Sequence, residues 1–319
     1  MKRLLLRITD ACTSRCRHCL HSCAPGRKGV MSPAAISRCI RQARPQEYVI
    51  VTGGEASLFP SLVTHALREA AELGIPSWLN TNGFWGCDAT VAARYARSLK
   101  REGLAVAAFS IDGLHQEFVP IGHVLCALRA CRDAGIPRVE AMVTFVDRSR
   151  TDIPVDNRTR EGLAELEREP GIRVCVRDSI SFIGRACASL AEYAPVLSAE
   201  AALGSTGEGY CSIQDERGAT KDFCAETFFL VNPNNTVDLC NVSFPGNLTE
   251  KPFAEIVCEE NLLSHPLLAA IQSEGLAGLY RMACEHGYVP RGRYTSRCDL
   301  CQSAQRWLKH TFPDVIENW

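Results

Sequence analysis

The sequence predicts an α/β fold in which six strand–helix units form a partial (βα)6 barrel, followed by a small C-terminal domain. Three observations predict it: strand-like and helix-like segments alternate over residues 1–185, several helical segments end at a glycine, and the alternation stops near residue 186. Alternation of this kind is typical of a parallel sheet with crossover helices. Six units are too few for a closed eight-stranded barrel.

The expected strands are short apolar runs, found at residues 4–8, 48–51, 78–80, 104–111, 139–146 and 172–183. The expected helices lie between them, for example at residues 33–43, 62–73, 89–101 and 124–134. Glycines stand where a left-handed helix cap is favoured, at Gly74, Gly103 and Gly135. We therefore expect a barrel over residues 1–186, a linker over 187–223 and a C-terminal domain over 224–319.

Composition excludes several classes of protein. The chain has 319 residues and a formal net charge of −1. It therefore lacks the surplus of basic residues that would indicate a nucleic-acid partner. No apolar run is long enough to cross a membrane, and Arg7 interrupts the only apolar stretch near the N-terminus. We expect a soluble, cytoplasmic protein. Its 17 cysteines are then unusual, and metal ligands or reactive thiols explain them better than disulfides.

Three cysteines follow the first expected strand directly, with the spacing Cys12-x-x-x-Cys16-x-x-Cys19. A loop of this size can hold three thiolates around one face of a 4Fe–4S cluster and leave the fourth iron open, whereas electron-transfer clusters use four cysteines. The alternative is a zinc knuckle, because cysteine pairs at these spacings also bind zinc.

A second signal follows the second expected strand, where Gly53, Gly54 and Glu55 come directly after Thr52. Two glycines allow the backbone to approach a ligand closely, and the carboxylate can pair with an ammonium group. In α/β barrels the chemistry lies at the carboxyl ends of the strands, where both signals stand.

With these motifs the chain resembles the radical S-adenosylmethionine (SAM) superfamily. The resemblance implies a six-stranded partial barrel, a 4Fe–4S cluster on the three cysteines and SAM bound to the open iron. It also implies that Gly53, Gly54 and Glu55 bind the amino group of the cofactor's methionine.

The same resemblance suggests further residues at the mouth of the barrel. Ser110 and Asp112 would face the ribose of the cofactor, and His18 takes the place of an aromatic residue near the adenine. Asn80 and Asn82 end the third strand at the same edge. Turn chemistry is the alternative for Ser110, Asp112 and Asn82, because Asn-Gly and Asp-Gly favour turns.

A second set of cysteines lies in the C-terminal third. An expected hairpin at residues 228–240 follows Cys224 and ends at Cys240, and Cys298-x-x-Cys301 comes later. Four thiolates would suit a structural zinc or a complete 4Fe–4S cluster, and the spacing does not separate them.

This segment resembles the twitch and SPASM domains, and the single later Cys-x-x-Cys matches the twitch version, with one auxiliary 4Fe–4S cluster. Asn235 stands where those domains carry a hairpin glycine, and asparagine tolerates the left-handed conformation. Two 4Fe–4S clusters and SAM are therefore the expected cofactors.

Several short segments resemble twitch enzymes that epimerise residues of ribosomal peptides, among them residues 18–25, 82–86 and 115–119. Those enzymes return hydrogen from a cysteine directly after the one that ends the hairpin, where this chain has Asn241. Cys187, after the sixth expected strand, is the replacement donor that we expect to project into the pocket. The alternative is a buried packing thiol.

The resemblance thus implies cleavage of SAM to a 5′-deoxyadenosyl radical and removal of hydrogen from a substrate C–H bond. Epimerisation with a cysteine donor is the leading outcome, and oxidation of a carbinol through the auxiliary cluster is the first alternative. The start of the chain at strand one favours an aminoglycoside-type sugar over a ribosomal peptide, although a peptide epimerase stays an alternative. Flavodoxin or ferredoxin would supply electrons. A zinc-binding interaction protein would leave Gly53, Gly54 and Glu55 unexplained.

Overall fold

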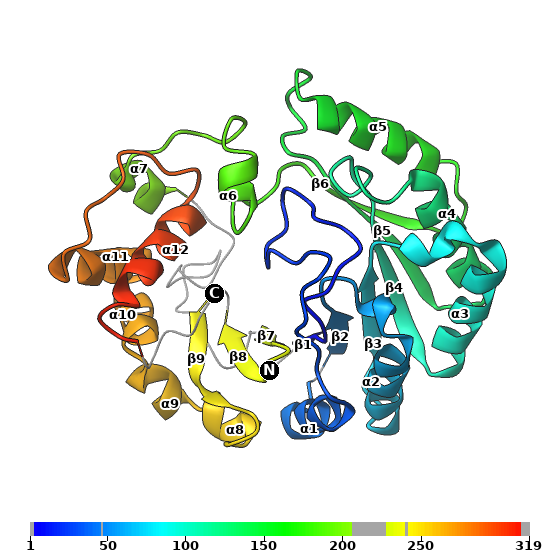
Figure 1. Cartoon of the computed structure of the whole chain (residues 1–319), viewed down its shortest axis with the longest axis horizontal. Helices are drawn as coiled ribbons and strands as arrows, with labels where there is room; N and C mark the ends of the chain where they lie inside the picture. The colour runs from blue at the N-terminus through cyan, green and yellow to red at the C-terminus, as the bar shows by residue number, and fades with distance from the viewer. Residues whose placement is uncertain (1–2, 46, 206–227, 240–241, 314–319) are drawn as a thin grey trace.

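The computed structural model describes residues 3–45, 47–205, 228–239 and 242–313. Its strands form one sheet of nine in the order β6-β5-β4-β3-β2-β1-β7-β8-β9. The sheet is curved, and the long segment after β1 lies inside the curve (Figure 1). No described helix is long and apolar enough to span a membrane.

Six parallel strands make up the predicted barrel half: β1 Arg3–Arg7, β2 Tyr48–Thr52, β3 Ser77–Thr81, β4 Leu104–Ser110, β5 Arg138–Thr144 and β6 Arg173–Arg177. Their parallel pairing in chain order confirms the predicted fold class. Crossover helices connect them: α1 Pro33–Ala43, α2 Pro60–Glu72, α3 Ala89–Arg101, α4 Ile121–Asp133 and α5 Pro154–Leu166, with the 3-10 turns η1 Ala56–Leu58 and η2 Phe84–Cys87.

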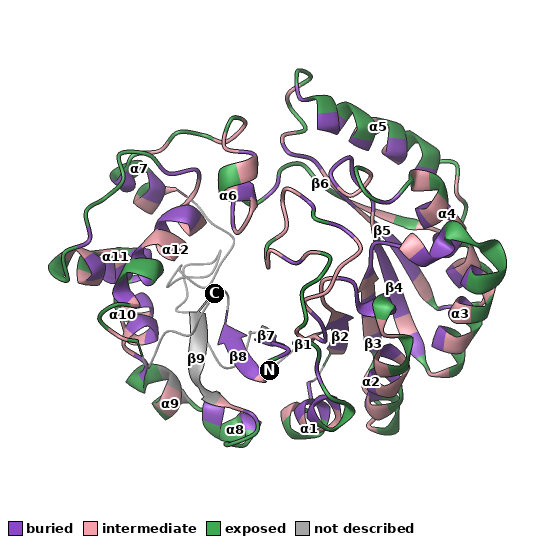
Figure 2. Ribbon diagram, in the orientation of Figure 1, coloured by how far each residue is buried: buried purple, intermediate pink, exposed green. Residues whose placement is uncertain are grey.

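Side-chain caps fix the starts of two helices, α1 and α3, whose bounds the sequence predicted without error. The Ser32 side chain accepts a hydrogen bond from the backbone of Ala35 at the start of α1, and the Asp88 carboxylate accepts two at the start of α3. The inner faces of these helices are buried against the sheet and their outer faces are exposed (Figure 2). Burial of this apolar face is the main force that holds the helices on the sheet.

The other strands and helices belong to the annex, as we call residues 186–313. Its hairpin strands are β7 Phe228–Val231, β8 Thr236–Leu239 and β9 Val242–Asn247. Its helices are α6 Ala186–Ser189, α7 Ala199–Gly204, α8 Phe253–Ile256, α9 Glu259–Ser264, α10 Pro266–Glu274, α11 Leu276–Glu285 and α12 Arg297–Leu308. Asn235 in the hairpin turn has φ 67°, the left-handed conformation that the sequence allowed there. Strand β7 pairs in parallel with β1, so the sheet continues from the barrel into the annex.

The sixth strand is shorter than predicted, because it ends at Arg177 and not near Ile183. Beyond the two strands the pairing changes from parallel to an isolated antiparallel bridge between Asp147 and Ser179, and the Asp156 carboxylate accepts hydrogen bonds from the backbone N–H groups of Val146 and Asp147, at 2.8 and 2.9 Å. Residues 180–185 then form a loop. Helix α5 lies where the six strand–helix units require a helix, between the fifth and sixth strands, although its bounds were not predicted.

Candidate functional site

The candidate site is a pocket of about 370 Å³ at the carboxyl ends of β1 to β4, which we call the central pocket. Four groups of residues line it: Cys12, Ser14, Cys16, His18, Cys19, Leu20 and Cys23 from the segment after β1; Thr52, Gly53, Gly54 and Glu55 at the end of β2; Asn80, Thr81 and Asn82 at the end of β3; and Ser110 at the end of β4, His115 after it and Met142 in β5. The sequence-predicted cysteines and the Gly-Gly-Glu element thus meet in one place.

The three cysteines belong to the cysteine loop, residues 8–32 between β1 and α1. Arg185 holds this loop from the other side of the barrel, because its guanidinium donates to the carbonyl of Cys16 at 2.7 Å and to that of Cys23 at 2.8 Å. The backbone of Arg185 also donates to the carbonyl of Cys19 at 3.1 Å. Sequence reasoning missed Arg185, because backbone carbonyls leave no pattern in the sequence.

The two glycines after β2 are required by the cysteine loop itself. A Cβ atom on Gly54 would lie 2.2 Å from the carbonyl oxygen of Ala11, and one on Gly53 would lie 2.9 Å from that of Thr9. The backbone N–H of Gly54 donates to Thr9 at 2.7 Å, and that of Glu55 donates to Ala11 at 2.8 Å. The glycines therefore let the end of β2 fasten the loop in place.

Glu55 is fully buried, and its carboxylate accepts three hydrogen bonds. The donors are the backbone N–H of Ser57 at 3.0 Å, the Thr81 hydroxyl at 2.9 Å and the backbone N–H of Asn82 at 2.7 Å. Burial raises the pKa of Glu55, and these donors oppose that effect. The residue thus joins the ends of β2 and β3 as well as lining the pocket, so its role is partly structural.

Asn82 has both of the roles that the sequence left open. Its side-chain oxygen accepts from the backbone of Phe84 at 3.1 Å, which is turn chemistry. Its amide nitrogen donates to the hydroxyl of Thr13 at 2.9 Å and so reaches the cysteine loop. Asn80 and Ser110 line the pocket as expected.

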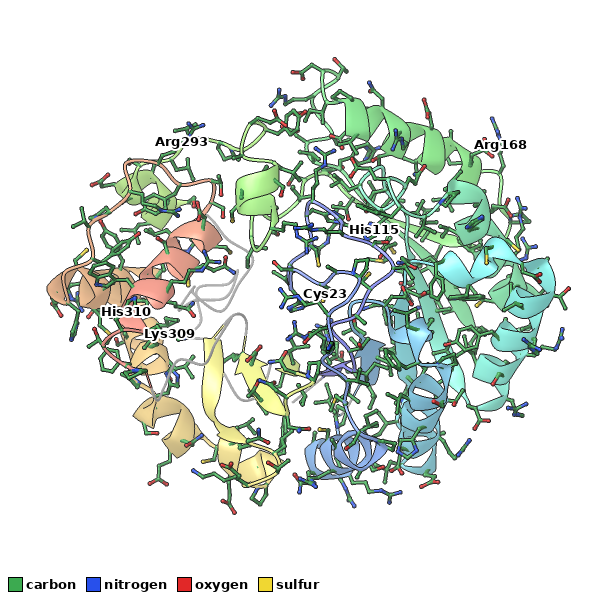
Figure 3. All side chains as sticks on the ribbon, viewed as in Figure 1. Cys23, His115, Arg168, Arg293, Lys309 and His310 are labelled. Carbon is green, nitrogen blue, oxygen red and sulfur yellow. The ribbon has the colours of Figure 1, made fainter. Side chains whose placement is uncertain are left out.

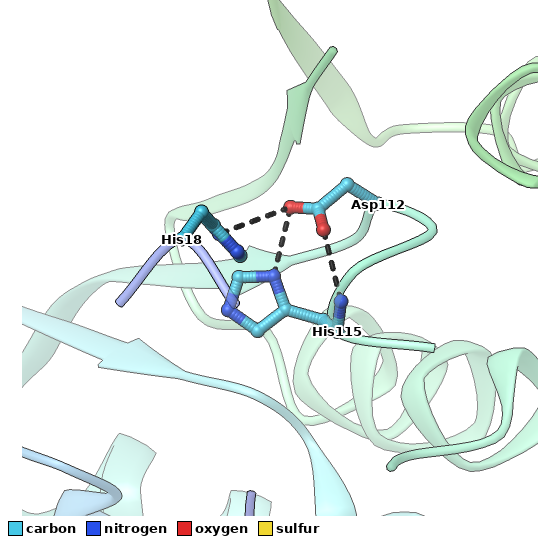
Figure 4. Close-up of side chains that lie close together, drawn as sticks. All are labelled: His18, Asp112 and His115. Carbon is cyan, nitrogen blue, oxygen red and sulfur yellow. Dashed lines mark hydrogen bonds and ion pairs between the residues drawn. The ribbon is translucent and has the colours of Figure 1, made fainter. Parts of the chain in front are cut away.

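Asp112 is not among the residues that line the pocket; it lies buried behind His115. Its carboxylate accepts from the backbone N–H of His115 at 2.9 Å and contacts the Nδ1 atom of that ring at 2.8 Å (Figure 4). The ring of His18 packs edge-on against that of His115, with centroids 4.7 Å apart. His115 is thus the pocket residue that the expected site lacked, although it begins one of the segments noted above for its resemblance.

The thiols of the pocket differ in their tendency to ionise. Burial raises the pKa of Cys12 to about 11 and also raises that of Cys16. A hydrogen bond from Cys23 lowers the pKa of Cys19 to about 6. Metal ligands must be thiolates, so a cationic group is needed to hold Cys12 and Cys16 in that form. Three thiols grouped at a pocket with polar walls fit a cluster that leaves one iron open to a ligand.

Cys187 does not lie where the sequence suggested. The expectation rested on a sixth strand that reaches residue 183, but Cys187 lies in α6, ten residues after the end of β6. Its thiol donates to the carbonyl of Phe182 at 3.2 Å, and the residue is not among those that line the central pocket. In contrast, Cys23, which belongs to the cysteine loop, does line the pocket and, like His115, lies near the middle of the molecule (Figure 3).

The second set of cysteines is described only in part. Cys298 and Cys301 lie in α12, and the amide of Gln305 donates to the Cys301 sulfur at 3.1 Å. Cys224 and Cys240 lie outside the described residues. The auxiliary cluster, the twitch domain and the domain boundaries therefore stay predictions.

The family model of the radical SAM superfamily matches residues 6–153, which contain the cysteine loop, the Gly-Gly-Glu element, Ser110, Asp112 and His115. This part of the chain is therefore a radical SAM domain. Domains of this family bind SAM and a 4Fe–4S cluster, and here Cys12, Cys16 and Cys19 are the residues that would hold the cluster. A search of curated protein sequences gave no match.

Solved structures of radical SAM enzymes are among the chains with a similar fold. "Crystal structure of Streptococcus suis SuiB bound to S-adenosylmethionine" aligns with 15% identity over 85% of this chain and 67% of that chain, with a TM-score of 0.49. "Native anSMEcpe with bound AdoMet and Cp18Cys peptide" aligns with 13% identity over 98% of this chain and 97% of that chain, with a TM-score of 0.49. "Crystal structure of BtrN in complex with AdoMet and 2-DOIA" aligns with 12% identity over 87% of this chain and 89% of that chain, with a TM-score of 0.48. Likeness at this level says nothing about the substrate of this chain.

Proposed function

We propose that this protein oxidises a carbinol of a small natural product, of the aminoglycoside type, by two electrons. SAM, when bound at the cluster, supplies the radical that removes a hydrogen atom from the substrate carbon. The residues of the central pocket position the cofactor and exclude water around that carbon. An electron donor such as flavodoxin or ferredoxin would start the cycle, and the annex cysteines would hold the cluster that takes up the electron left on the substrate.

One observation carries this choice over epimerisation. All thiols among the described residues that line the central pocket belong to the cysteine loop, and the Cys187 thiol hydrogen-bonds to Phe182 instead. Inversion of a carbon needs a thiol on the side opposite to the one from which hydrogen was removed. Oxidation needs no such donor, so this pocket suits it better.

Epimerisation is the second candidate, and Cys23 is the observation that favours it. Its thiol lines the central pocket outside the predicted ligand set, and a hydrogen bond to Cys19, together with burial, raises the pKa of Cys23. A thiol that keeps its proton is the form that can return a hydrogen atom. The substrate of such an epimerase would be the same sugar or a ribosomal peptide.

The experiment that separates these outcomes is turnover in deuterated water with reconstituted enzyme, dithionite, SAM and a panel of aminocyclitols that begins with 2-deoxystreptamine. Oxidation gives a product two mass units lighter with no deuterium at the reacting carbon. Epimerisation gives a product with one deuteron there, because thiol hydrogen exchanges with solvent. Cys23→Ala and Cys187→Ala are the matched variants: neither should affect oxidation, and loss of an epimerised product in one of them would identify the donor and contradict our proposal.

A further inference from the structure

Asp112 and His115 form a hydrogen-bonded pair beside the central pocket that the proposed function has not yet used. The Asp112 carboxylate accepts from the His115 backbone at 2.9 Å and contacts its Nδ1 atom at 2.8 Å. Two contacts to one carboxylate fix both the position of the residue and the rotation of its ring. A histidine held in this way is pre-oriented for proton transfer.

The arrangement also determines which nitrogen faces the pocket. Since Asp112 has only acceptor oxygens when ionised, Nδ1 of His115 carries the proton of this contact. The Nε2 atom makes no hydrogen bond to any residue within the described part of the chain, and His115 lines the central pocket. A free Nε2 beside the reaction site, with Nδ1 bound to a carboxylate, is the arrangement of a general base.

A metal ion is the competing use of these side chains, since ligand atoms of His18, Asp112 and His115 all lie within 4.8 Å of one another. Neighbouring ligands of one ion, each about 2.1 Å from it, lie about 3 to 3.5 Å apart. The His18 Nε2 atom is 3.9 Å from the Asp112 carboxylate, too far for that arrangement. The 2.8 Å contact joins Asp112 and His115, and Figure 4 draws it together with the longer ion pair between His18 and Asp112.

The charged groups around His115 act on its proton in opposite directions. Burial lowers the pKa of His115, but the Asp112 carboxylate outweighs it, and Cys19 and Glu55 act in the same direction as Asp112, so the pKa is raised overall. The Asp112 carboxylate lies 2.8 Å from Nδ1 of His115 and 3.9 Å from Nε2 of His18, so it orients His115 and not His18.

We propose that His115, oriented by Asp112, accepts the hydroxyl proton of the carbinol substrate. This inference rests on the proposed function. As the carbinol carbon loses its hydrogen atom to the cofactor-derived radical, the O–H bond breaks and its proton binds to Nε2 of His115. The remaining electron passes to an oxidised iron–sulfur cluster, and the carbon–oxygen bond becomes a carbonyl. His115 is a catalytic residue in this step, and Asp112 is a positioning residue.

The test compares wild type with His115→Gln and Asp112→Asn, and with His65→Gln as the control. His65 lies on α2, where its ring hydrogen-bonds to Ser37, away from the pocket. With the aminocyclitol panel, ketone and 5′-deoxyadenosine are measured against pH. Without substrate, hydrogen exchange at each imidazole ring of the reconstituted protein, followed by mass spectrometry, gives the pKa of every histidine.

We expect His115→Gln to lower ketone formation about 100-fold and Asp112→Asn about 10-fold, while 5′-deoxyadenosine stays within about twofold. Wild-type ketone formation should rise with pH as His115 loses its proton, and His115→Gln should remove that rise. The groups that face His115 from the neighbouring elements are Asp112, His18, Cys19 and Glu55. Asp112→Asn should lower the pKa of His115, and His65→Gln should change none of these quantities.

The following results would overturn the proposal. Equal ketone formation by His115→Gln and wild type, or an unchanged pKa of His115 in Asp112→Asn, removes the pair from the chemistry. If wild type forms 5′-deoxyadenosine but only an epimer, or consumes no carbinol of the panel, there is no hydroxyl proton to accept and the radical SAM activity still stands. If wild type forms no 5′-deoxyadenosine at all, the proposed function fails with it, and the exchange data then report only how the pair is built.

Discussion

The two cysteine sets lie in regions that are built differently. The first set is carried by one loop, and the ends of β2 and β3 fasten that loop through backbone contacts. The second set combines residues around a hairpin with residues on α12, more than fifty positions later in the chain. A ligand set on one loop is specified locally, whereas a set divided between distant elements depends on how those elements pack.

The difference teaches where sequence patterns are informative. In the barrel half, each functional side chain follows a parallel strand, and all such strands end at the same edge, so position along the chain gives position in space. In the annex no such rule connects α12 with the hairpin. The following predictions test this contrast, from the largest effect to the smallest.

Loss of the first cysteine set should have the largest effect. Changing Cys12, Cys16 and Cys19 together to Ala should abolish 5′-deoxyadenosine formation and lower iron from about eight to about four per chain. Changing Cys298 and Cys301 to Ala should lower iron by the same amount but leave cofactor cleavage. Iron, sulfide and 5′-deoxyadenosine are measured after anaerobic reconstitution. Stoichiometric zinc without sulfide in either set would contradict the cluster assignment for that set.

Gly54 tests whether the loop is fastened by close backbone contact. Gly54→Ala places a Cβ atom 2.2 Å from a carbonyl oxygen of the cysteine loop, so we expect a loss of about 3 kcal/mol in the free energy of unfolding. Gly122→Ala is the control, because nothing lies within 4 Å of its Cβ position in α4 and alanine favours helices by about 0.5–1 kcal/mol. Urea unfolding measures both. Equal effects of the two substitutions would show that the contact is not limiting.

Glu55→Gln tests two roles of this residue: its hydrogen bonds between the ends of β2 and β3, and its expected contact with SAM. If the carboxylate pairs with the methionine ammonium group, SAM affinity should fall by about 1.5–3 kcal/mol, the range for a hydrogen bond to a charged group. Titration of reconstituted protein measures it, with Glu72→Gln on the exposed side of α2 as the control. Unchanged affinity would leave Glu55 a purely structural residue.

The smallest effect concerns the pH dependence of the Asp112–His115 pair. The contribution of Asp112 is complete above its unfolded pKa of 3.8 and is lost as pH falls through its lowered folded pKa. That of His115 is complete below its unfolded pKa of 6.5 and is lost as pH rises through its raised folded pKa. A double-mutant cycle with Asp112→Asn and His115→Gln should give a coupling of about 1.5 kcal/mol near pH 5. A coupling that does not vary between acid and alkaline pH would contradict the pairing.

Much of the barrel half could be predicted from the sequence, because apolar runs, caps and terminal glycines are local signals. The bounds of α1 and α3 follow from Ser32 and Asp88, and the pocket residues from the strand ends. Turn chemistry and site chemistry coincide at Asn82, which is why spacing alone left that residue open.

What could not be predicted depends on contacts between distant segments. The segment after β5 is held by Asp156 on α5, the parallel pairing with β6 ends there, and Cys187 follows only after the loop beyond it. The support from Arg185 comes through backbone carbonyls, which every residue has. His115 belonged to a recognised segment, but only its contact with Asp112 distinguishes it from a surface histidine.

The pairing of β1 with β7 bears on the order in which the protein assembles during translation. Leu4 emerges from the ribosome early, yet its partner Phe229 follows only after the whole barrel half has been made. Until then one edge of β1 has unpaired backbone groups, which are prone to pairing with another chain. The loop that receives the cluster begins on this same strand. Completion of the metal site is thereby linked to the hairpin that begins at residue 228, which is synthesised late. Nascent chains truncated before that residue should aggregate more readily than the full chain.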